Sequence, residues 1–211
     1  MTNRFATVFV LLAVAAASQA CTPIGAAVGA GATVGVAASE ERGVSGVVDD
    51  AKIRLEINKL WLDQDFEMYR KVDMSVVEGR VLLTGEVAKP EHRVEAVRLT
   101  WQAEGVREVI NEIKVGDTAG IKDFKNDVWI GTELRSRLMF DKFIRNINYT
   151  VDVVNGDVYL TGIAQNQAEL NRVIDHAREV PRVRRVVNYV VMKDDPKRKK
   201  AGEPAPAPAK N

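Results

Sequence analysis

Apolar residues recur along this chain with two different periods, and both periods return in its second half. Apolar and polar side chains alternate around Val72, Met74 and Val76. This alternation predicts a β-strand, because successive side chains of a strand point to opposite faces. The same pattern returns at Tyr149, Val151 and Val153.

A helical pattern precedes each of these strands. Apolar residues three and four positions apart predict helices with core positions at Ile53, Ile57, Leu60 and Trp61 in the first half and at Ile130, Leu134 and Leu138 in the second. An aspartate stands ahead of each pattern, Asp50 in the first and Asp127 in the second. Aspartate is a favoured N-cap residue, so both are expected to cap their helices.

The two halves are copies of one unit. Residues 50–115 match residues 127–192 at a constant offset of 77, with fifteen identities and no gap, which indicates a tandem duplication. Identities cluster around Gly79 and Gly156. Each glycine follows a polar residue between two apolar runs, which predicts a tight hairpin turn.

A second helix and a third strand are expected after each hairpin. Pro90 predicts the start of a helix with apolar positions at Val94, Val97 and Trp101, matched in the second copy by Leu170, Val173, Ile174 and Ala177. Third strands are predicted over residues 106–113 and 183–190. The fold class is therefore α+β, with two tandem αββαβ domains, each a small three-stranded mixed sheet with two helices. A unit of about 66 residues buries only a modest core, so the two domains are expected to pack together or work as a pair.

The N-terminus has the pattern of an export signal. Arg4 precedes an apolar run over residues 5–17, which is too short to span a bilayer comfortably, and small residues follow at 18–20. Cleavage there leaves Cys21 first, a position that resembles the lipobox cysteine of bacterial lipoproteins. Ser18 and Gln19 depart from the usual box and also suit ordinary signal peptidase, which would leave a soluble periplasmic protein. Thr22 in place of Asp favours the outer membrane over the inner one.

The remaining boundaries follow from composition. We expect a signal peptide over 1–20, a lipid-anchored Gly/Ala spacer over 21–46, the first domain over 47–116, a linker over 117–124, the second domain over 125–193 and a disordered basic Pro/Ala tail over 194–211.

Charge and cysteine content exclude several classes of protein. The 211 residues contain 30 Lys plus Arg and 29 Asp plus Glu, which argues against a nucleic-acid-binding protein that works by global positive charge. One Cys excludes a disulfide framework and a thiolate zinc site. The near-neutral total conceals a polarised chain. Residues 48–115 have a net charge of −3, residues 125–192 of +2 and residues 193–211 of +3.

The repeated unit resembles a known family. A turn glycine, a strand ending in Leu-Thr-Gly, a helix and then Val-x-x-Val-x-Asn are similar to the BON domain of bacterial periplasmic proteins, and two such units behind a lipobox resemble the dual-BON outer-membrane lipoproteins. The resemblance covers Cys21 to Met192. It implies binding to anionic phospholipid through the second domain, support of envelope integrity and no catalysis.

Differences between the copies indicate where a membrane could be bound. Trp129 lies about 100° from the core stripe of its helix and aligns with Lys52, and Phe140 returns to nearly the same azimuth and aligns with Asp63. Tryptophan favours membrane interfaces. The expected lipid-binding residues are Trp129, Arg135, Ser136, Arg137, Met139 and Phe140. Packing of Trp129 against the acidic first domain stays open, as does binding of a protein client, as in the osmotic-stress BON proteins.

No enzyme is predicted. His92 and His176 do not align at the offset of 77 and have no second metal ligand at a suitable spacing, so both are expected to be surface residues. The chain has no phosphate-binding glycine loop and no Ser/His/Asp order typical of a catalytic triad. We therefore expect no cofactor, no metal, no small-molecule substrate and no nucleic acid as partner.

Overall fold

The computed structural model describes residues 37–116, 121–196 and 198. The predicted signal peptide, Cys21, the spacer as far as residue 36 and the tail from residue 199 lie outside the described residues. Residues 37 onward belong to one compact unit, which contains both copies of the repeat.

The first domain has three helices and a small sheet. Its elements are α3 (Gly43–Gln64), α4 (Phe66–Lys71), β1 (Val72–Val77), β2 (Arg80–Val87), α5 (Pro90–Thr100), β3 (Glu108–Asn111) and β4 (Lys114–Val115). Helix α3 begins within the segment that the sequence assigned to the spacer. The short helix α4 was not predicted. Asp65 caps it, and its carboxylate accepts a hydrogen bond from the backbone N–H of Met68 at 3.0 Å.

The second domain repeats this order with one change. Its elements are α6 (Ile121–Phe140), the 3₁₀ turn η2 (Asn146–Asn148), β5 (Tyr149–Val154), β6 (Asp157–Ala164), α7 (Gln167–Glu179), β7 (Arg185–Asn188) and β8 (Val191–Met192). Turn η2 stands where the first domain has α4. Helix α6 begins at Ile121, inside the predicted linker 117–124.

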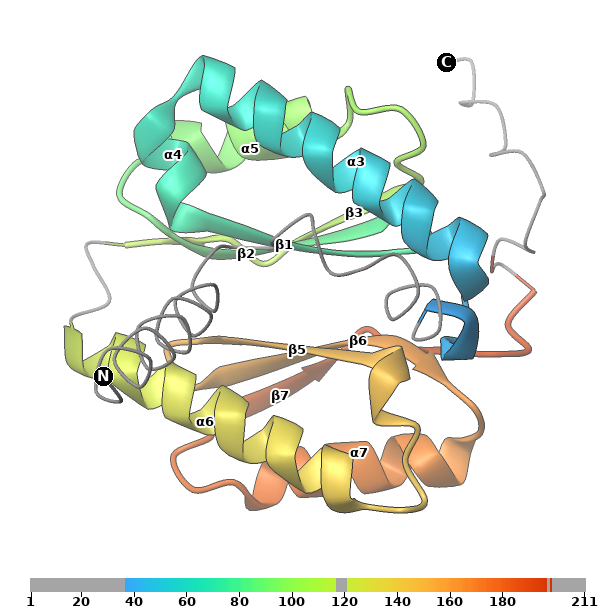
Figure 1. Ribbon diagram of the computed structural model, residues 1–211. Coiled ribbons are helices and arrows are strands. Elements are labelled where there is room, and N and C mark those ends of the chain that lie inside the picture. The colour runs from blue at the N-terminus through green and yellow to red at the C-terminus, as the bar shows by residue number, and fades with distance from the viewer. Residues whose placement is uncertain (1–36, 117–120, 197, 199–211) are drawn as a thin grey trace, which may run out of the picture. The chain divides into compact units, whose positions relative to one another are not determined.

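Both sheets have the same topology. In the first, β2 pairs antiparallel with β1 and parallel with β3 and β4, and in the second β6 pairs in the same way with β5, β7 and β8. Helices α3 and α5 cover one face of the first sheet, and α6 and α7 cover one face of the second (Figure 1). The α+β class with two mixed sheets is confirmed.

The predicted third strand is broken in each domain. Asn111 separates β3 from β4, and its side chain accepts a hydrogen bond from the N–H of Ile113 at 3.1 Å. Asn188 does the same for Val190 at 3.0 Å. An asparagine that bonds its own backbone two residues on turns the chain locally. The Asn of the repeated Val-x-x-Val-x-Asn motif therefore interrupts the strand.

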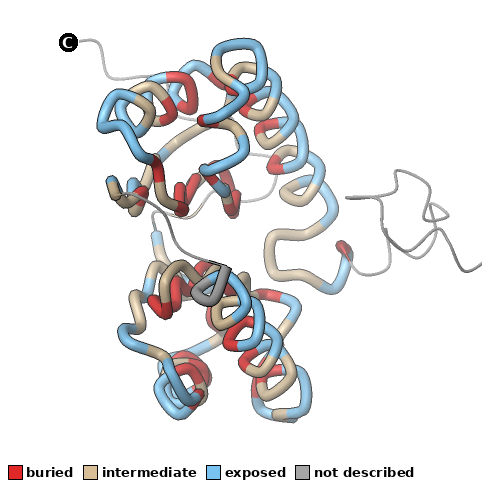
Figure 2. The backbone as a smooth tube through the Cα atoms, turned by 90° about the vertical axis from the view of Figure 1, so that its left-hand side faces the viewer, coloured by how far each residue is buried: buried red, intermediate tan, exposed pale blue. Residues whose placement is uncertain are grey.

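Each domain has its own apolar core. Buried residues repeat along one side of the long helices (Figure 2). In the first domain Ile57 and Trp61 of α3 pack over Val81 and Leu83 of β2, and the second domain has Ile130 and Leu134 of α6 over Val158 and Leu160 of β6. The predicted core positions of α3 and α6 are thus buried, except for Leu60, which is partly buried. In α5 and at its C-cap the pattern misled, because Val94 and Trp101 are exposed.

The N-cap prediction for the two aspartates is wrong. Asp50 lies inside α3, and its two carboxylate oxygens accept hydrogen bonds from the backbone N–H groups of Glu78 and Gly79, both at 2.9 Å. Asp127 of α6 does the same for Asn155 at 2.6 Å and Gly156 at 2.7 Å. All four turn residues have positive φ, as a type I′ turn requires. The aspartates therefore fasten each helix to its hairpin.

The outer faces of the two sheets contact each other through equivalent residues. Ser75 Oγ donates to Asp152 Oδ2 at 2.6 Å, and the hydroxyl of Tyr189 donates to Glu112. Both pairs are 77 residues apart, the offset of the duplication. Residues that meet their own counterparts lie near a two-fold axis, so the domains associate with pseudo-two-fold symmetry. The expectation that they pack together is confirmed.

Candidate membrane-docking surface

Exposed apolar residues follow the outer face of α6. Trp129 is 41% exposed and Phe140 is 79% exposed, and eleven residues bring the helix back to within about 20° of the same azimuth. Ser136 lies between them on this face. At 1.5 Å per residue, the two aromatic residues are separated by about 16 Å along the helix axis. Trp129, Ser136 and Phe140 form what we call the outer stripe.

The tryptophan end of the outer stripe carries a stacked cation. The guanidinium carbon of Arg182 lies 5.3 Å from the centroid of the Trp129 ring, which is within range of a cation–π interaction. Nη1 of Arg182 also donates to Asn126 Oδ1 at 3.3 Å. Trp129 is 41% exposed and stacks on a residue of its own domain, which favours the surface reading over the interdomain alternative.

The phenylalanine end is wider than the sequence indicated. Met139 is exposed beside Phe140, and Phe143, which was not predicted, is exposed just beyond the helix. The Phe143 ring lies 5.1 Å from Lys142 Nζ and 4.9 Å from the guanidinium carbon of Arg172. Phe143 aligns with Phe66, which is also exposed and lies near Arg70, so an exposed phenylalanine beside a cation is common to both domains.

Asp141 positions this end. Its carboxylate accepts hydrogen bonds from the N–H of Phe143 at 2.9 Å and from Nη2 of Arg172 at 2.7 Å. Nε2 of His176 also lies 2.9 Å from this carboxylate. The bond with His176, with the Phe143 amide and Arg172 contributing, lowers the pKa of Asp141 to about 2. His176 is therefore a structural partner of this turn, which the sequence reading as a plain surface histidine missed.

The two arginines expected to meet lipid phosphate are not on the outer stripe. Arg135 folds back toward the sheet and donates to the carbonyl of Val151. Arg137 lies on the other edge of α6, where Nε bonds Glu133 at 2.8 Å and Nη1 lies 3.7 Å from Glu179. Of the six expected residues, the structure brings Trp129, Ser136, Met139 and Phe140 toward one surface, and it places Arg135 and Arg137 on either side of it.

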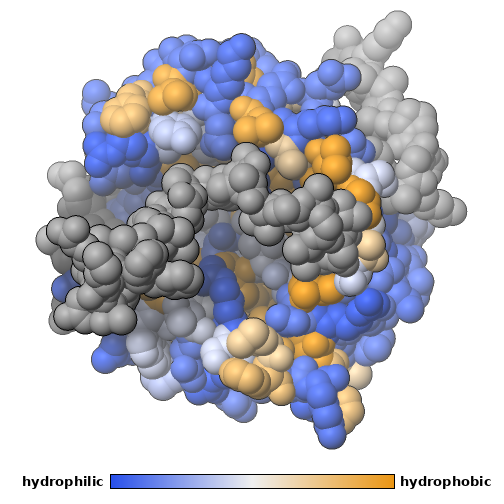
Figure 3. All heavy atoms as spheres, viewed as in Figure 1, coloured by the Kyte–Doolittle hydropathy of each residue, from blue (hydrophilic) through white to orange (hydrophobic). Residues whose placement is uncertain are grey.

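Exposed apolar residues are not confined to the second domain. Figure 3 shows hydrophobic side chains at the surface of both domains. On α3, Val48, Leu55 and Leu62 are exposed and lie seven residues apart, and therefore along one line of the helix. Their counterparts in α6 are Lys125, Thr132 and Met139. The two long helices thus expose different stripes.

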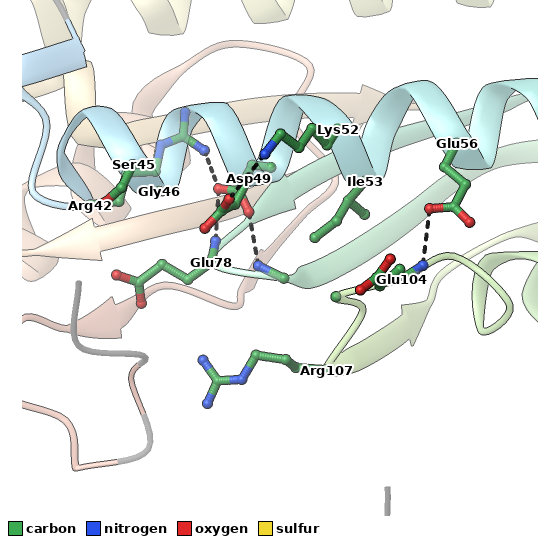
Figure 4. Close-up of a pocket in the computed structure, with 13 residues that line it drawn as sticks. Arg42, Ser45, Gly46, Asp49, Lys52, Ile53, Glu56, Glu78, Glu104 and Arg107 are labelled. Carbon is green, nitrogen blue, oxygen red and sulfur yellow. Dashed lines mark hydrogen bonds and ion pairs between the residues drawn. The ribbon is translucent and has the colours of Figure 1, made fainter. Parts of the chain in front are cut away.

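A cavity of about 380 Å³ lies beside the hairpin of the first domain (Figure 4). Arg42, at the start of α3, bonds Asp50 at 2.7 Å, and the N–H of Glu104 donates to Glu56 at 3.0 Å across the opening. These lining charges already neutralise one another in part. Among the described residues no group of three or more His, Cys, Asp or Glu is placed to hold a metal ion.

No helix in the described part of the chain is long and apolar enough to cross a membrane. The cationic groups beside the outer stripe are compatible with contact at an anionic surface. The family model for the BON domain matches residues 49–117 and 126–194, which together make up more than half of the chain.

The chain belongs to the BON-domain family. Its two BON domains are those described above, and the matched segments begin within α3 and α6. The hairpin glycines and the strand-breaking asparagines on which the resemblance rested have the structural roles given above.

Three relatives extend the match beyond the single domain. An uncharacterised protein from the gshII 5′ region of Anaplasma centrale is 40% identical over 69% of this chain and 96% of its own length. Outer membrane lipoprotein DolP of Haemophilus influenzae is 29% identical over 80% of this chain and 86% of its own. Osmotically-inducible protein Y of Escherichia coli is 25% identical over 69% and 73%. The chain is thus a dual-BON protein similar to DolP.

Proposed function

We propose that this chain is a non-enzymatic cell-envelope protein whose second BON domain docks reversibly on anionic phospholipid through the outer stripe of α6 and so supports outer-membrane integrity. The observation that carries the proposal is the exposure of Trp129 and Phe140 at positions where the first domain has Lys52 and Asp63. Two domains with the same fold do not need aromatic residues in one copy and charged residues in the other at equivalent exposed positions in order to fold. The difference therefore calls for a contact made by one domain only.

The energetics favour a weak, reversible contact. A basic residue near an anionic bilayer contributes about 1 kcal/mol, and a partly inserted aromatic side chain contributes roughly 1.5–3 kcal/mol at most. Stable residence at a membrane takes two signals. We propose that the second is lipid attached at Cys21, which would hold the protein on the periplasmic face of the outer membrane. The similarity to an outer membrane lipoprotein supports this location.

The docking proposal is tested by exchanging residues between the copies. The double variant Trp129→Lys and Phe140→Asp gives α6 the residues that the first domain carries at the same places, so the fold should tolerate them. Residues 37–211, the compact unit, are mixed with vesicles of phosphatidylcholine alone or with phosphatidylglycerol, and recovery in flotation is measured. We expect binding to the anionic vesicles to fall roughly tenfold or more.

Leu55→Glu is the matched control, because it places a charge on an exposed apolar position of α3. It should leave vesicle binding unchanged. Equal recovery of the unaltered protein on neutral and anionic vesicles, or full binding by the double variant, would refute the proposal. Mass spectrometry of the mature N-terminus tests the anchor, since an acylated Cys21 differs in mass from a free one; a free thiol would leave a soluble periplasmic protein.

A protein client is the second candidate function. It is favoured by the α3 stripe, because apolar residues seven apart are typical of a helix that packs against another helix. Pull-down from envelope extract separates the two functions. A client held by α3 should survive detergent and be lost with Leu55→Glu, whereas a bilayer contact should be lost in detergent.

A further inference from the structure

The backbone of Arg182 has an unusual conformation. Its φ is +69°, in the left-handed region that residues with a Cβ rarely adopt. The equivalent residue of the first domain is Gly105, with φ +89°. The turn thus requires this conformation in both domains, and the first domain meets the requirement with the residue that suits it. Strained residues of this kind tend to be kept where the side chain has a use.

The side chain of Arg182 is directed to another residue specific to the second domain. It stacks on Trp129, whose counterpart is Lys52, and the counterpart of Arg182 itself has no side chain. Both members of the pair are therefore absent from the first domain. Asn126 fixes the guanidinium at its edge through the bond to Nη1. The strained turn, the stacked ring and the amide together hold one cation over the exposed face of the tryptophan.

This arrangement has the chemistry of a phosphate site. A guanidinium has five N–H donors in a planar fork that matches two oxygens of a phosphodiester, and Asn126 occupies Nη1. Tryptophan in a membrane lies at the level of the headgroups, which brings a cation stacked on it to the level of the phosphates. Arg182 is exposed to solvent in the structure, so it can be reached from outside.

We propose that Arg182, held over Trp129, is the phosphate-binding residue of the docking surface and that its ligand is the phosphodiester of an anionic phospholipid. This inference rests on the proposed docking of the outer stripe. It assigns to Arg182 the role expected of Arg135 and Arg137. Arg137 is paired with the carboxylate of Glu133 and Arg135 is turned back to the carbonyl of Val151, whereas Arg182 bonds the neutral amide of Asn126.

The test is Arg182→Gly, which removes the side chain and gives the turn the residue of the first domain. Because Gly suits a positive φ, the melting temperature should be unchanged or higher. Binding of residues 37–211 to phosphatidylglycerol-containing vesicles should fall about fivefold, the loss of one basic residue near the bilayer, with little change on phosphatidylcholine alone. Arg182→Lys keeps the positive charge but lacks the planar guanidinium, so it should restore only part of the vesicle binding that Arg182→Gly loses.

Arg98→Ala is the control for net charge, since it removes an exposed cation from the first domain, and it should change binding less than Arg182→Gly. Unchanged binding by Arg182→Gly, or an equal loss with Arg98→Ala, would overturn the assignment. So would an equal loss on both kinds of vesicle, because phosphatidylcholine has the same phosphodiester and the assignment requires the net negative charge of the anionic lipid. If the Trp129→Lys and Phe140→Asp variant also binds normally, the docking proposal itself has failed; if only that variant loses binding, docking stands without Arg182.

Discussion

Helices α3 and α6 hold equivalent places over their sheets, yet their outer faces differ at several exposed positions. Among the residues they share, Asp50 and Asp127 bond the hairpin, and Ile53 and Ile130 fill the core. The exposed apolar residues differ, because α3 has the line through Leu55 and α6 has the outer stripe. Comparison of the two copies thus separates two sets of residues. Residues that the fold requires are the same or similar in both copies, and residues available for contact with other molecules differ.

The largest effect should come from a position where both copies need glycine. Gly162 has φ +135°, and a Cβ there would lie 2.0 Å from the carbonyl oxygen of Asn148; at Gly85 the distance to the Lys71 oxygen is 2.2 Å. We expect Gly162→Ala and Gly85→Ala each to lower the free energy of unfolding by roughly 3 kcal/mol. Urea denaturation measures this. A loss below 1 kcal/mol in only one copy would mean that the two glycine positions, in β2 and β6, are not equivalent.

A smaller effect is expected where the copies share a residue but differ in burial. Asp50→Ala leaves two buried turn amides without their acceptor, at a cost of about 2–3 kcal/mol, whereas the amides bonded to Asp127 are only part-buried and Asp127→Ala should cost about 1–2 kcal/mol. The melting temperatures of the two variants measure which substitution destabilises the protein more. The reverse order would show that the hairpin of the second domain depends more on its helix.

The smallest effect on stability is expected at Asp141, a residue that only the second copy has, and it should change with pH. Asp141, which aligns with Gln64, has a pKa lowered to about 2, so the stability it adds is fully present above its ordinary pKa of 3.8 and is lost as the pH falls to about 2. Asp141→Asn should therefore lower the melting temperature at pH 6, and the difference from the unaltered protein should shrink toward pH 2. A difference that does not change with pH would contradict the role of the ionised carboxylate.

The fold could be predicted because the hydrophobic pattern of the main helices and strands occurs twice, once in each copy. The period of that pattern distinguishes a helix from a strand. Asp50 was misread for a physical reason. An acidic residue ahead of an apolar helical run is the usual sign of an N-cap, while its actual acceptor role depends on a turn 28 residues away that only tertiary structure brings close.

The surface was predicted in part. The azimuths of Trp129 and Phe140 follow from helix geometry alone, and both residues are exposed. Arg137 could have been set aside, because Glu133 stands four residues before it, a spacing typical of an ion pair. Arg182 could not be found in the same way, since its role depends on a left-handed turn and on a stacking contact across 53 positions of sequence.

The pseudo-two-fold contact has a consequence for dissection of this protein. Leu82 and Tyr159 are equivalent residues that belong to neither domain's own core, yet they are 1% and 0% exposed. Each sheet therefore buries an apolar outer face against the other domain. A single BON domain cut from the chain would uncover that face, and a second copy of the same domain is already nearly complementary to it. Isolated domains should tend to form homodimers that mimic the parent, with two identical stripes in place of two different ones.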